Sequence, residues 1–309
     1  MTRCFSLMAA VCAALAILPH SAFADAPSEP TRFLEADGIR YAYRDLGADN
    51  PGTPLILITR YRANMDDWDP AFLDALANHR RVIAFNQAGI SSSGGSVPGT
   101  IKGMAADVAA FANAMSFEAV DILGWSMGGF TAQAVAVDYP DLVRKVVLIG
   151  TGPAASDHTP GPKDGVFDVA VKPSRADGKT TYADEDRAYL FFADDPKSKA
   201  RAQASFDRID AARRDDEPVT GHSVMQTQTG AIQDFWFNTD NGYFDGLSGV
   251  DDPVLIINGD NDAFFTVQAQ AVLFSELPNA QLAIFPAAGH GPQHQHPNAV
   301  AETIDRFLD

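Results

Sequence analysis

One serine lies in a setting that could make it a nucleophile. Ser126 is the centre of the segment Gly-Trp-Ser-Met-Gly at 124–128, which directly follows the apolar run 120–123. In a nucleophile elbow, a buried strand turns sharply into a helix and holds such a serine in strained geometry with an exposed hydroxyl. Glycines two positions before and after the serine fit this turn, because side chains there would press on neighbouring backbone. The segment could also be a small-residue turn without chemistry, so the chain must also supply a base and an acid.

A histidine and an aspartate follow two later strands and would complete this chemistry. A serine hydroxyl attacks when a base removes its proton, and a third group must hold the base in the right tautomer. The apolar runs 254–257 and 282–285 lead into loops that carry Asp262 and His290. Because parallel strands place their carboxyl ends at one edge of a sheet, we expect both residues to meet Ser126 there.

The elements that must position these residues are predicted by the hydrophobic pattern. Short apolar runs alternate with helical stretches at 101–115 and 129–139, where apolar residues recur every three or four positions. This alternation is typical of an α/β fold with a mostly parallel central sheet flanked by helices. Two further segments, joined by Asp37-Gly38, predict an antiparallel hairpin. The expected strands are 31–35, 39–46, 54–59, 82–85, 120–123, 146–149, 254–257 and 282–285.

The regular alternation stops between about residues 153 and 249. This stretch contains charged helical segments at 183–192 and 198–215 and the aromatic cluster Phe235-Trp236-Phe237. Because it separates two central strands, we expect it to form a helical lid above the strand ends. The sequence therefore predicts one domain over 25–309, with its core at about 31–152 and 250–309.

Together these motifs resemble the α/β-hydrolase family, in particular lidded bacterial esterases and cofactor-free haloperoxidase-like hydrolases. The resemblance covers about 31–309 and includes the matching stretches 85–89, 104–108, 258–262 and 289–291. It implies the α/β-hydrolase fold with an inserted helical lid, no metal or organic cofactor, and the chain order serine, acid, histidine. The family's spacing of a glycine, two residues and an aspartate selects Asp262 as the acid, which leaves Asp260 as a turn residue.

The family also has an oxyanion hole made of two backbone N–H groups. One donor would be Met127, directly after the serine. Where the family usually has His-Gly before the second donor, this chain has Thr59-Arg60, and the donor corresponds to Tyr61. The arginine is a departure, because it puts a β-carbon and a long cation where the family's loop is slim. Arg60 and Arg62 could recognise a substrate carboxylate, polarise a carbonyl, or be ordinary surface cations.

Several aromatic residues are candidates for substrate contact. Trp125 occupies the variable position of the elbow and could touch substrate or pack beside the site. Trp236 is a candidate for substrate binding, as part of a group that could line an acyl pocket or pack the lid onto the body. This group comprises Phe191, Phe192, Phe235, Trp236 and Phe237.

Three histidines near the C-terminus raise the alternative of a zinc site. His290, His294 and His296 lie within seven residues, and Asp262 is predicted nearby. Prolines at 292 and 297 break the helical register that would bring the rings together, and zinc would leave the serine elbow unexplained. We therefore expect no metal, with His294 and His296 as surface or helix-cap residues.

The first two dozen residues are typical of a signal peptide. A short basic start precedes the apolar stretch 5–18, and small residues precede a predicted cleavage after Ala24. The alternative, a membrane anchor, would be short for a bilayer. We expect a periplasmic or secreted protein. Both cysteines lie in this segment, so the exported chain would have neither disulfides nor a cysteine nucleophile.

The charge of the chain bears on its partners. A formal net charge of -17 argues against binding to nucleic acid or to anionic membrane surfaces. We expect a small-molecule acyl substrate and no stable membrane association after signal removal, while the oligomeric state stays open.

The sequence thus predicts an exported serine hydrolase that cleaves a small or medium carboxylic ester through an acyl-enzyme. Ser126 would attack, His290 would move the proton, and Asp262 would orient the histidine. The same residues could instead serve acyl transfer, perhydrolysis, or amide or carbon–carbon bond hydrolysis. From a different class, the chain could be a ligand-binding member of the fold without hydrolysis.

Overall fold

The computed structural model describes residues 29–157, 159–174 and 181–309. The predicted signal peptide at 1–24, with both cysteines, lies outside these described residues. No helix in the described ranges is long and apolar enough to cross a bilayer.

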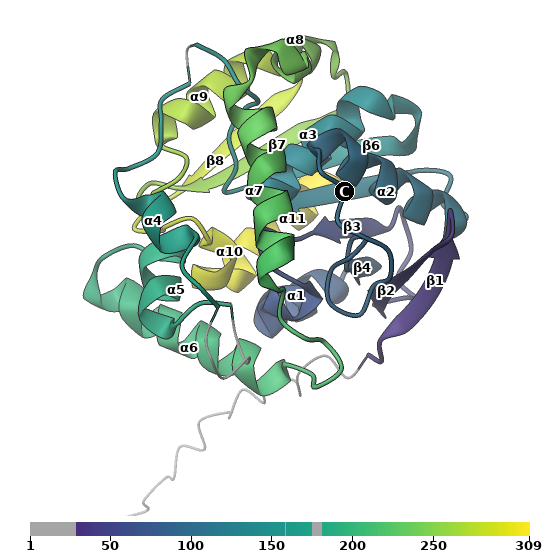
Figure 1. Ribbon diagram of the computed structural model, residues 1–309, viewed down its shortest axis with the longest axis horizontal. Coiled ribbons are helices and arrows are strands. Elements are labelled where there is room, and N and C mark those ends of the chain that lie inside the picture. Colours follow the sequence, from purple (N-terminus) through teal and green to yellow (C-terminus); the bar gives the residue numbers. More distant parts are fainter. Residues whose placement is uncertain (1–28, 158, 175–180) are drawn as a thin grey trace, which may run out of the picture.

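One eight-stranded sheet organises the chain (Figure 1). Its strands run in the order β1-β2-β4-β3-β5-β6-β7-β8, and only the pairs β1–β2 and β2–β4 are antiparallel. This arrangement confirms the predicted α/β fold with a mostly parallel sheet. The strands are β1 Arg32–Ala36, β2 Ile39–Leu46, β3 Leu55–Ile58, β4 Val82–Phe85, β5 Val120–Trp125, β6 Val143–Ile149, β7 Val254–Gly259 and β8 Ala280–Phe285.

The central strands are apolar on both faces because helices cover both. Every residue of β3, β4, β5 and β7 is buried, as expected for parallel strands between two helical layers. At the antiparallel edge, Asp37 and Gly38 both have positive φ, 49° and 78°, which matches the type I′ turn of a two-residue hairpin.

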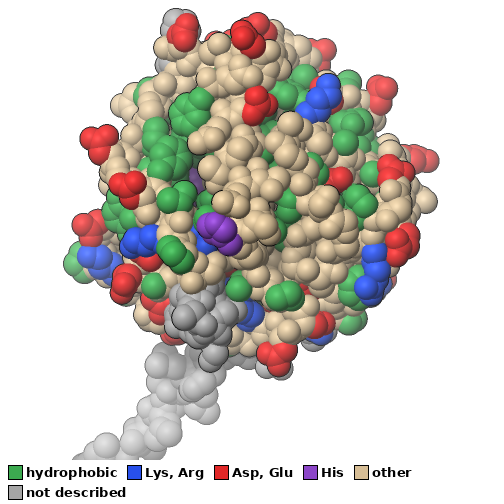
Figure 2. Space-filling model, viewed as in Figure 1, with side chains coloured by type: hydrophobic (Ala, Val, Ile, Leu, Met, Phe, Trp, Pro, Cys, Tyr) green, Lys and Arg blue, Asp and Glu red, His purple; other side chains and the backbone are tan. Residues whose placement is uncertain are grey.

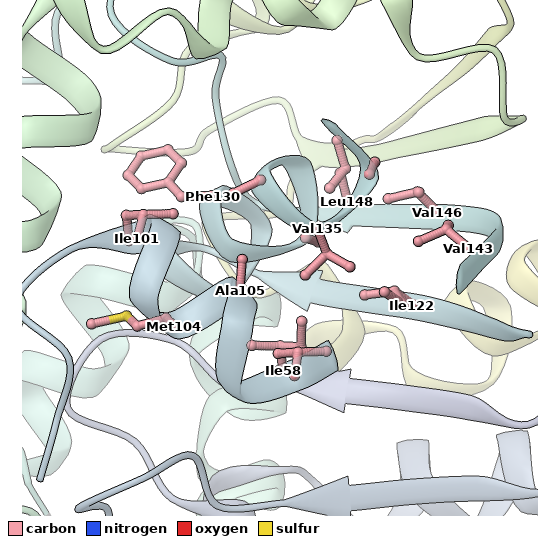
Figure 3. Close-up of a cluster of buried hydrophobic side chains, with 14 of the residues drawn as sticks. Ile58, Ile101, Met104, Ala105, Ile122, Phe130, Val135, Val143, Val146 and Leu148 are labelled. Atoms are coloured by element: carbon pink, nitrogen blue, oxygen red, sulfur yellow. The ribbon is translucent and has the colours of Figure 1, made fainter. Parts of the chain in front are cut away.

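Two hydrophobic cores follow from the alternation of side chains along these strands. On one face, residues such as Ile58 and Ile122 pack against α2 and α3 (Figure 3). On the other face, neighbours such as Leu57 and Leu123 pack against α1 and α11. The helices outside the region between β6 and β7 are α1 Pro70–Ala77, α2 Ile101–Ala114, α3 Met127–Asp138, α9 Val267–Glu276, α10 Pro292–Gln295 and α11 Pro297–Leu308, with short 3₁₀ turns η1 Met65–Asp67 and η2 Pro140–Leu142.

In the described residues between β6 and β7, all the elements are helical. α7 contacts α2, while α6 contacts α1, α10 and η1, so this inserted segment lies against the body of the domain (Figure 1). It comprises α4 Val166–Ala170, α5 Asp184–Phe191, α6 Pro196–Ala212, α7 His222–Phe237, η3 Thr239–Asn241, α8 Tyr243–Gly246 and η4 Leu247–Gly249.

Candidate active site

Ser126 lies in the sharp turn between β5 and α3, in the geometry of a nucleophile elbow. Its backbone has φ 57° and ψ -119°, a conformation that costs free energy for any residue with a side chain. A Cβ at Gly124 would lie 2.2 Å from the Gly128 carbonyl oxygen, and one at Gly128 would lie 2.2 Å from the Ile58 oxygen. Both glycines are therefore required by close backbone contacts, which hold the serine in its strained conformation.

A continuous hydrogen-bond chain joins the three residues that the sequence placed at separate strand ends. The Ser126 hydroxyl lies 2.8 Å from Nε2 of His290, and Nδ1 of the same ring lies 2.9 Å from Oδ2 of Asp262. Both the histidine and the aspartate are at least 98 % buried. In this geometry the imidazole can accept the serine proton while its other nitrogen donates to the carboxylate.

The two aspartates in the loop after β7 have different contacts. Asp262 Oδ1 accepts the backbone N–H groups of Phe264 and Phe265 at 2.7 and 3.1 Å, which orients its other oxygen toward His290. Asp260 is exposed and accepts the N–H of Ala288 at 3.2 Å. The carboxylate that faces the histidine is therefore the one selected by the motif spacing, and Asp260 braces the turn.

Aromatic rings surround the His290 imidazole. Phe264 lies 4.6 Å from it between ring centroids, and Phe191 of α5 lies 6.2 Å away. Trp125 packs behind the histidine, where its Nε1 donates to the His290 carbonyl oxygen at 3.0 Å. Trp125 does not line the cavity described below, so of its two predicted roles the geometry favours packing beside the site.

The two expected oxyanion donors border the same space as the serine. Met127 begins α3, and Tyr61 lies in the loop after β3. In the described part of the chain, neither backbone N–H donates to another group. Both residues line the cavity together with Ser126. They remain the candidates for binding an oxygen that gains negative charge next to the serine.

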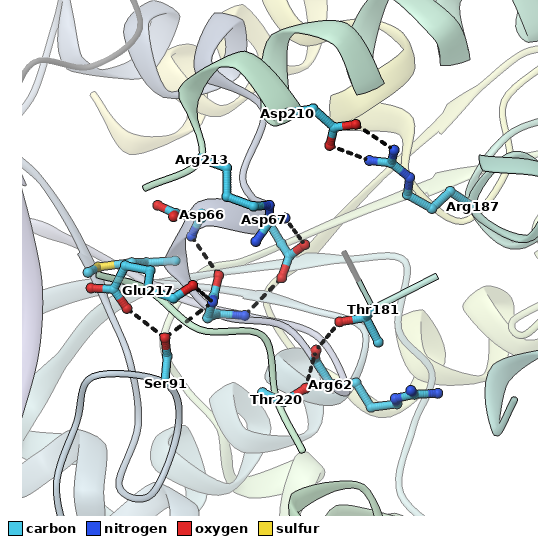
Figure 4. A network of polar contacts seen from close by, with 12 residues as sticks. Arg62, Asp66, Asp67, Ser91, Thr181, Arg187, Asp210, Arg213, Glu217 and Thr220 are labelled. Carbon is cyan, nitrogen blue, oxygen red and sulfur yellow. Dashed lines mark hydrogen bonds and ion pairs between the residues drawn. The ribbon is translucent and has the colours of Figure 1, made fainter. Parts of the chain in front are cut away.

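The inserted segment holds the loop that carries Tyr61. The Tyr61 hydroxyl lies 2.8 Å from Thr229 Oγ1, and the Arg62 N–H donates to Gln228 Oε1 at 2.8 Å, both on α7. The carbonyl oxygen of Arg62, a residue with φ 60°, accepts the hydroxyls of Thr181 and Thr220 at 3.1 and 2.7 Å (Figure 4). Sequence reasoning missed these partners, because contacts between residues 119 to 168 positions apart leave no local pattern.

Neither Arg60 nor Arg62 is a surface cation, since they are 5 % and 1 % exposed. Arg62 donates to the carbonyl oxygens of Ala170 and Lys172 at 3.0 and 2.7 Å, so it ties the inserted segment to the body. Arg60 lines the cavity beside the serine. The sequence analysis gave Arg60 and Arg62 the same possible roles, but their surroundings in the structure differ.

A cavity of about 310 Å³ opens next to Ser126 and His290. Its walls are mostly apolar, and eleven of the lining residues come from the inserted segment. Phe191, Trp236 and Phe237 line it, whereas Phe192 packs on Phe206 and Phe235 on Phe130. The lining residues from the inserted segment are Phe167, Ala170, Val171, Tyr182, Leu190, Phe191, Thr229, Ile232, Gln233, Trp236 and Phe237.

His294 corrects one sequence prediction. It is not a surface residue: it is 4 % exposed, and its ring packs 4.6 Å from that of Trp125. Burial lowers its pKa to about 4, which keeps the imidazole neutral at physiological pH. His296 is the residue before α11, as predicted for a helix cap. Among the described residues no group of three or more His, Cys, Asp or Glu side chains could hold a metal ion.

The α/β-hydrolase class is defined by a strained serine at the end of a parallel strand, together with an acid and a histidine that follow two later strands. A model of the alpha/beta hydrolase fold family matches residues 53–297. The chain belongs to this family and is an enzyme of the hydrolase type.

The individual relatives share less than 30% sequence identity with this chain. A poly(3-hydroxyalkanoate) depolymerase of Ectopseudomonas oleovorans is 28% identical over 289 residues, which cover 87% of this chain and 93% of the relative. A putative carbamate hydrolase, RutD, of Rhizobium rhizogenes is 23% identical over 264 residues, which cover 85% and 95%. Among solved structures, an alpha/beta hydrolase fold protein from Chitinophaga pinensis superposes with a TM-score of 0.79 at 28% identity, covering 92% of this chain and 99% of that one.

Proposed function

We propose that the protein is a serine hydrolase that cleaves a carboxylic ester with a small or medium acyl group. The observation that carries this proposal is the hydrogen-bond chain from the Ser126 hydroxyl through His290 to Asp262, with distances of 2.8 and 2.9 Å. A serine is a poor nucleophile without such a base, and the base needs a partner that keeps its Nε2 free to accept a proton. The hydrolase relatives support the same reaction class.

In the proposed mechanism, the Ser126 oxygen attacks the ester carbonyl while His290 Nε2 takes the hydroxyl proton. Asp262 stabilises the positively charged imidazole that forms. The N–H groups of Met127 and Tyr61 bind the oxygen that becomes negative. His290 then passes the proton to the leaving alcohol. Water, activated by the same histidine, releases the acid and restores the serine.

The cavity supports an apolar substrate part of modest size. At about 310 Å³ it lies at the lower end of ordinary ligand pockets, and aromatic and aliphatic side chains form most of its wall. Phe167, Val171 and Phe237 line it while being 37 %, 43 % and 58 % exposed, so they mark its opening. Figure 2 shows hydrophobic side chains on this face, between the positions of α4 and α7. We expect the acyl chain to enter here.

The test is hydrolysis of acyl esters of graded chain length together with labelling by a fluorophosphonate probe, which reacts covalently with activated serines. We expect turnover and labelling in the wild type. Ser126→Ala should lower kcat by about 10⁴-fold or more and abolish labelling, because it removes the hydroxyl that His290 would activate. Ser275→Ala, an exposed serine on α9, is the control. A wild type that is not labelled, or an alanine variant with wild-type turnover, would refute the proposal.

A further inference from the structure

Arg60 is a buried cation in the wall of the cavity that contains the serine. It lines the cavity with Ser126 and His290 and is only 5 % exposed. Its guanidinium carbon lies 4.6 Å from the ring centre of Phe191 and 5.3 Å from that of Trp125. These are the rings that also flank the imidazole of His290. A residue with a positively charged side chain thus lines the same mostly apolar cavity as Ser126 and His290.

The charge of Arg60 is incompletely balanced by its surroundings. Its nearest carboxylate, Asp67, lies 3.4 Å away. That carboxylate is closer to Arg213, at 2.9 Å (Figure 4). The same carboxylate also accepts the N–H of Asn64. Arg62, the neighbouring cation, has carbonyl and hydroxyl oxygens as its partners. Among the described residues, the guanidinium groups of Arg60 and Arg213 therefore share the Asp67 carboxylate.

The hydrogen-bonding capacity of Arg60 is also unfilled. One terminal nitrogen donates to the Tyr61 carbonyl oxygen at 2.8 Å, while Nε has no partner among the described residues. Burial lowers the pKa of Arg60. Asp67 and Tyr182 oppose this shift, while the nearby cations Arg62 and Arg213 add to it. Because arginine stays protonated in proteins, this environment makes the charged side chain costly. An anion in the cavity would reduce that cost.

We propose that Arg60 binds a carboxylate of the substrate, so that the preferred ester carries an acidic group a few bonds from the reacting carbonyl. This inference rests on the proposed function, because it assumes that Ser126 attacks an ester in this cavity. The carboxylate would accept from the guanidinium and supply the missing negative charge. In a site from which water is excluded, such a charge-assisted hydrogen bond is stronger than a neutral one. The half-esters of small dicarboxylic acids have this chemistry.

The experiment compares acidic and neutral methyl esters of matched length. Monomethyl succinate, glutarate and adipate are paired with methyl butanoate, pentanoate and hexanoate, and kcat/KM is measured for each. The net charge of -17 repels anions at long range, so the assay is run at about 0.15 M salt, where that field is screened. For at least one pair we expect the wild type to favour the acidic ester by about tenfold or more.

The variants test whether Arg60 is the cause of this preference. In Arg60→Met the ratio of acidic to neutral kcat/KM should fall by about tenfold or more, mainly through a higher KM for the acidic ester. Arg60→Lys should keep part of the ratio, because the charge remains. Arg187→Met is a matched control: Arg187 is equally buried and lies 4.1 Å from the Phe206 ring, but it does not line the cavity. It should leave the ratio unchanged.

The outcomes separate this inference from the proposed function. The inference is overturned if the wild type hydrolyses neutral esters at least as well as acidic ones, or if Arg60→Met keeps the wild-type ratio. In either case Arg60 has only a packing role, and the proposal of ester hydrolysis stands. If no ester is hydrolysed and the fluorophosphonate probe does not label the protein, both fail together.

Discussion

Asp262 illustrates how a single side chain can determine which proton moves. One of its oxygens is held by the N–H groups of Phe264 and Phe265, and the other faces Nδ1 of His290. With Nδ1 bound to a carboxylate, the ring proton stays on that nitrogen and leaves Nε2 as the acceptor for the serine. The exposed Asp260, two residues earlier, has no contact with the ring, although its chemistry is the same.

This difference gives a prediction at the scale of one residue. Asp262→Asn should lower kcat by about 10³- to 10⁴-fold, because an amide cannot hold the imidazole in the same tautomer or stabilise its positive charge. The matched control is Asp260→Asn, which changes an identical side chain in the same loop and should keep kcat within about threefold. Steady-state kinetics on one ester measures both. Equal losses in the two variants would mean that loop distortion, and not the tautomer of His290, causes the effect.

At the scale of elements, α7 is the structural partner of the loop that carries the second oxyanion donor. In this loop, Arg62 adopts a positive φ of 60°. Such a loop is held in place by its contacts, and α7 provides two of them through Gln228 and Thr229. The inserted segment therefore does more than cover the cavity, because it also braces the backbone that is proposed to stabilise the reaction.

Replacing Gln228 should weaken catalysis more than binding. In Gln228→Leu the Arg62 N–H loses its acceptor, and the Tyr61 peptide shifts. We expect kcat to fall about tenfold with little change in KM, because the oxyanion forms only in the transition state. Gln228→Glu keeps an acceptor oxygen and should restore part of the loss. Gln226→Leu alters an exposed glutamine on the same helix and serves as the control.

A boronic acid inhibitor adds a readout that general destabilisation would not produce. Because it mimics the tetrahedral intermediate, its affinity should fall in parallel with kcat in Gln228→Leu. Unchanged inhibitor affinity, or a change confined to KM, would show that α7 does not position the donor.

At the scale of the whole molecule, buried polar groups join the inserted segment to the body. Asp69, at the start of α1, binds Arg208 and Ser205 of α6 at 2.6 Å each. His294 lies beside them, 3.4 Å from Ser205 Oγ, with its ring on Trp125. Burial lowers the pKa of His294 to about 4, so the folded protein holds this histidine neutral over a pH range in which an unfolded chain would protonate it.

The stability of the protein should therefore depend on pH through His294. Between about pH 6.5 and pH 4 the unfolded chain binds this proton and the folded chain does not, so the free energy of unfolding falls as the pH falls. The contribution from this residue is at most about 3 kcal/mol, and it does not grow further below pH 4. Urea unfolding across pH 4 to pH 7.5 measures the slope.

Two histidine variants test whether His294 causes this pH dependence of the free energy of unfolding. In His294→Gln the free energy of unfolding should depend less steeply on pH in this window, whatever the change in absolute stability. His222→Gln, which removes an exposed histidine at the start of α7, should keep the wild-type slope. A His294 variant with an unchanged slope would show that other groups carry the acid sensitivity.

Much of the architecture was predictable because it depends on local patterns. The apolar runs of β3, β4 and β7 match the buried strands, and the three- and four-residue spacing matches α2 and α3. The surface position predicted for His294 was wrong, because its burial depends on residues far away in the sequence. Nothing in the residues near it indicates that Trp125 and Ser205 of α6 pack against it, since those partners lie 89 or more positions away.

The sequence by itself indicated the fold class and the three residues proposed for catalysis. An elbow of small residues, an acid loop and a histidine loop each follow a short apolar run typical of a buried strand, and the family's spacing selected Asp262. The tertiary structure decided what surrounds them. It placed Arg60 in the cavity wall and Arg62 in the anchoring of the inserted segment, although the two arginines are nearly adjacent. Burial, charge balance and cavity shape arise from segments packed together in space, and these properties are not encoded at any one position.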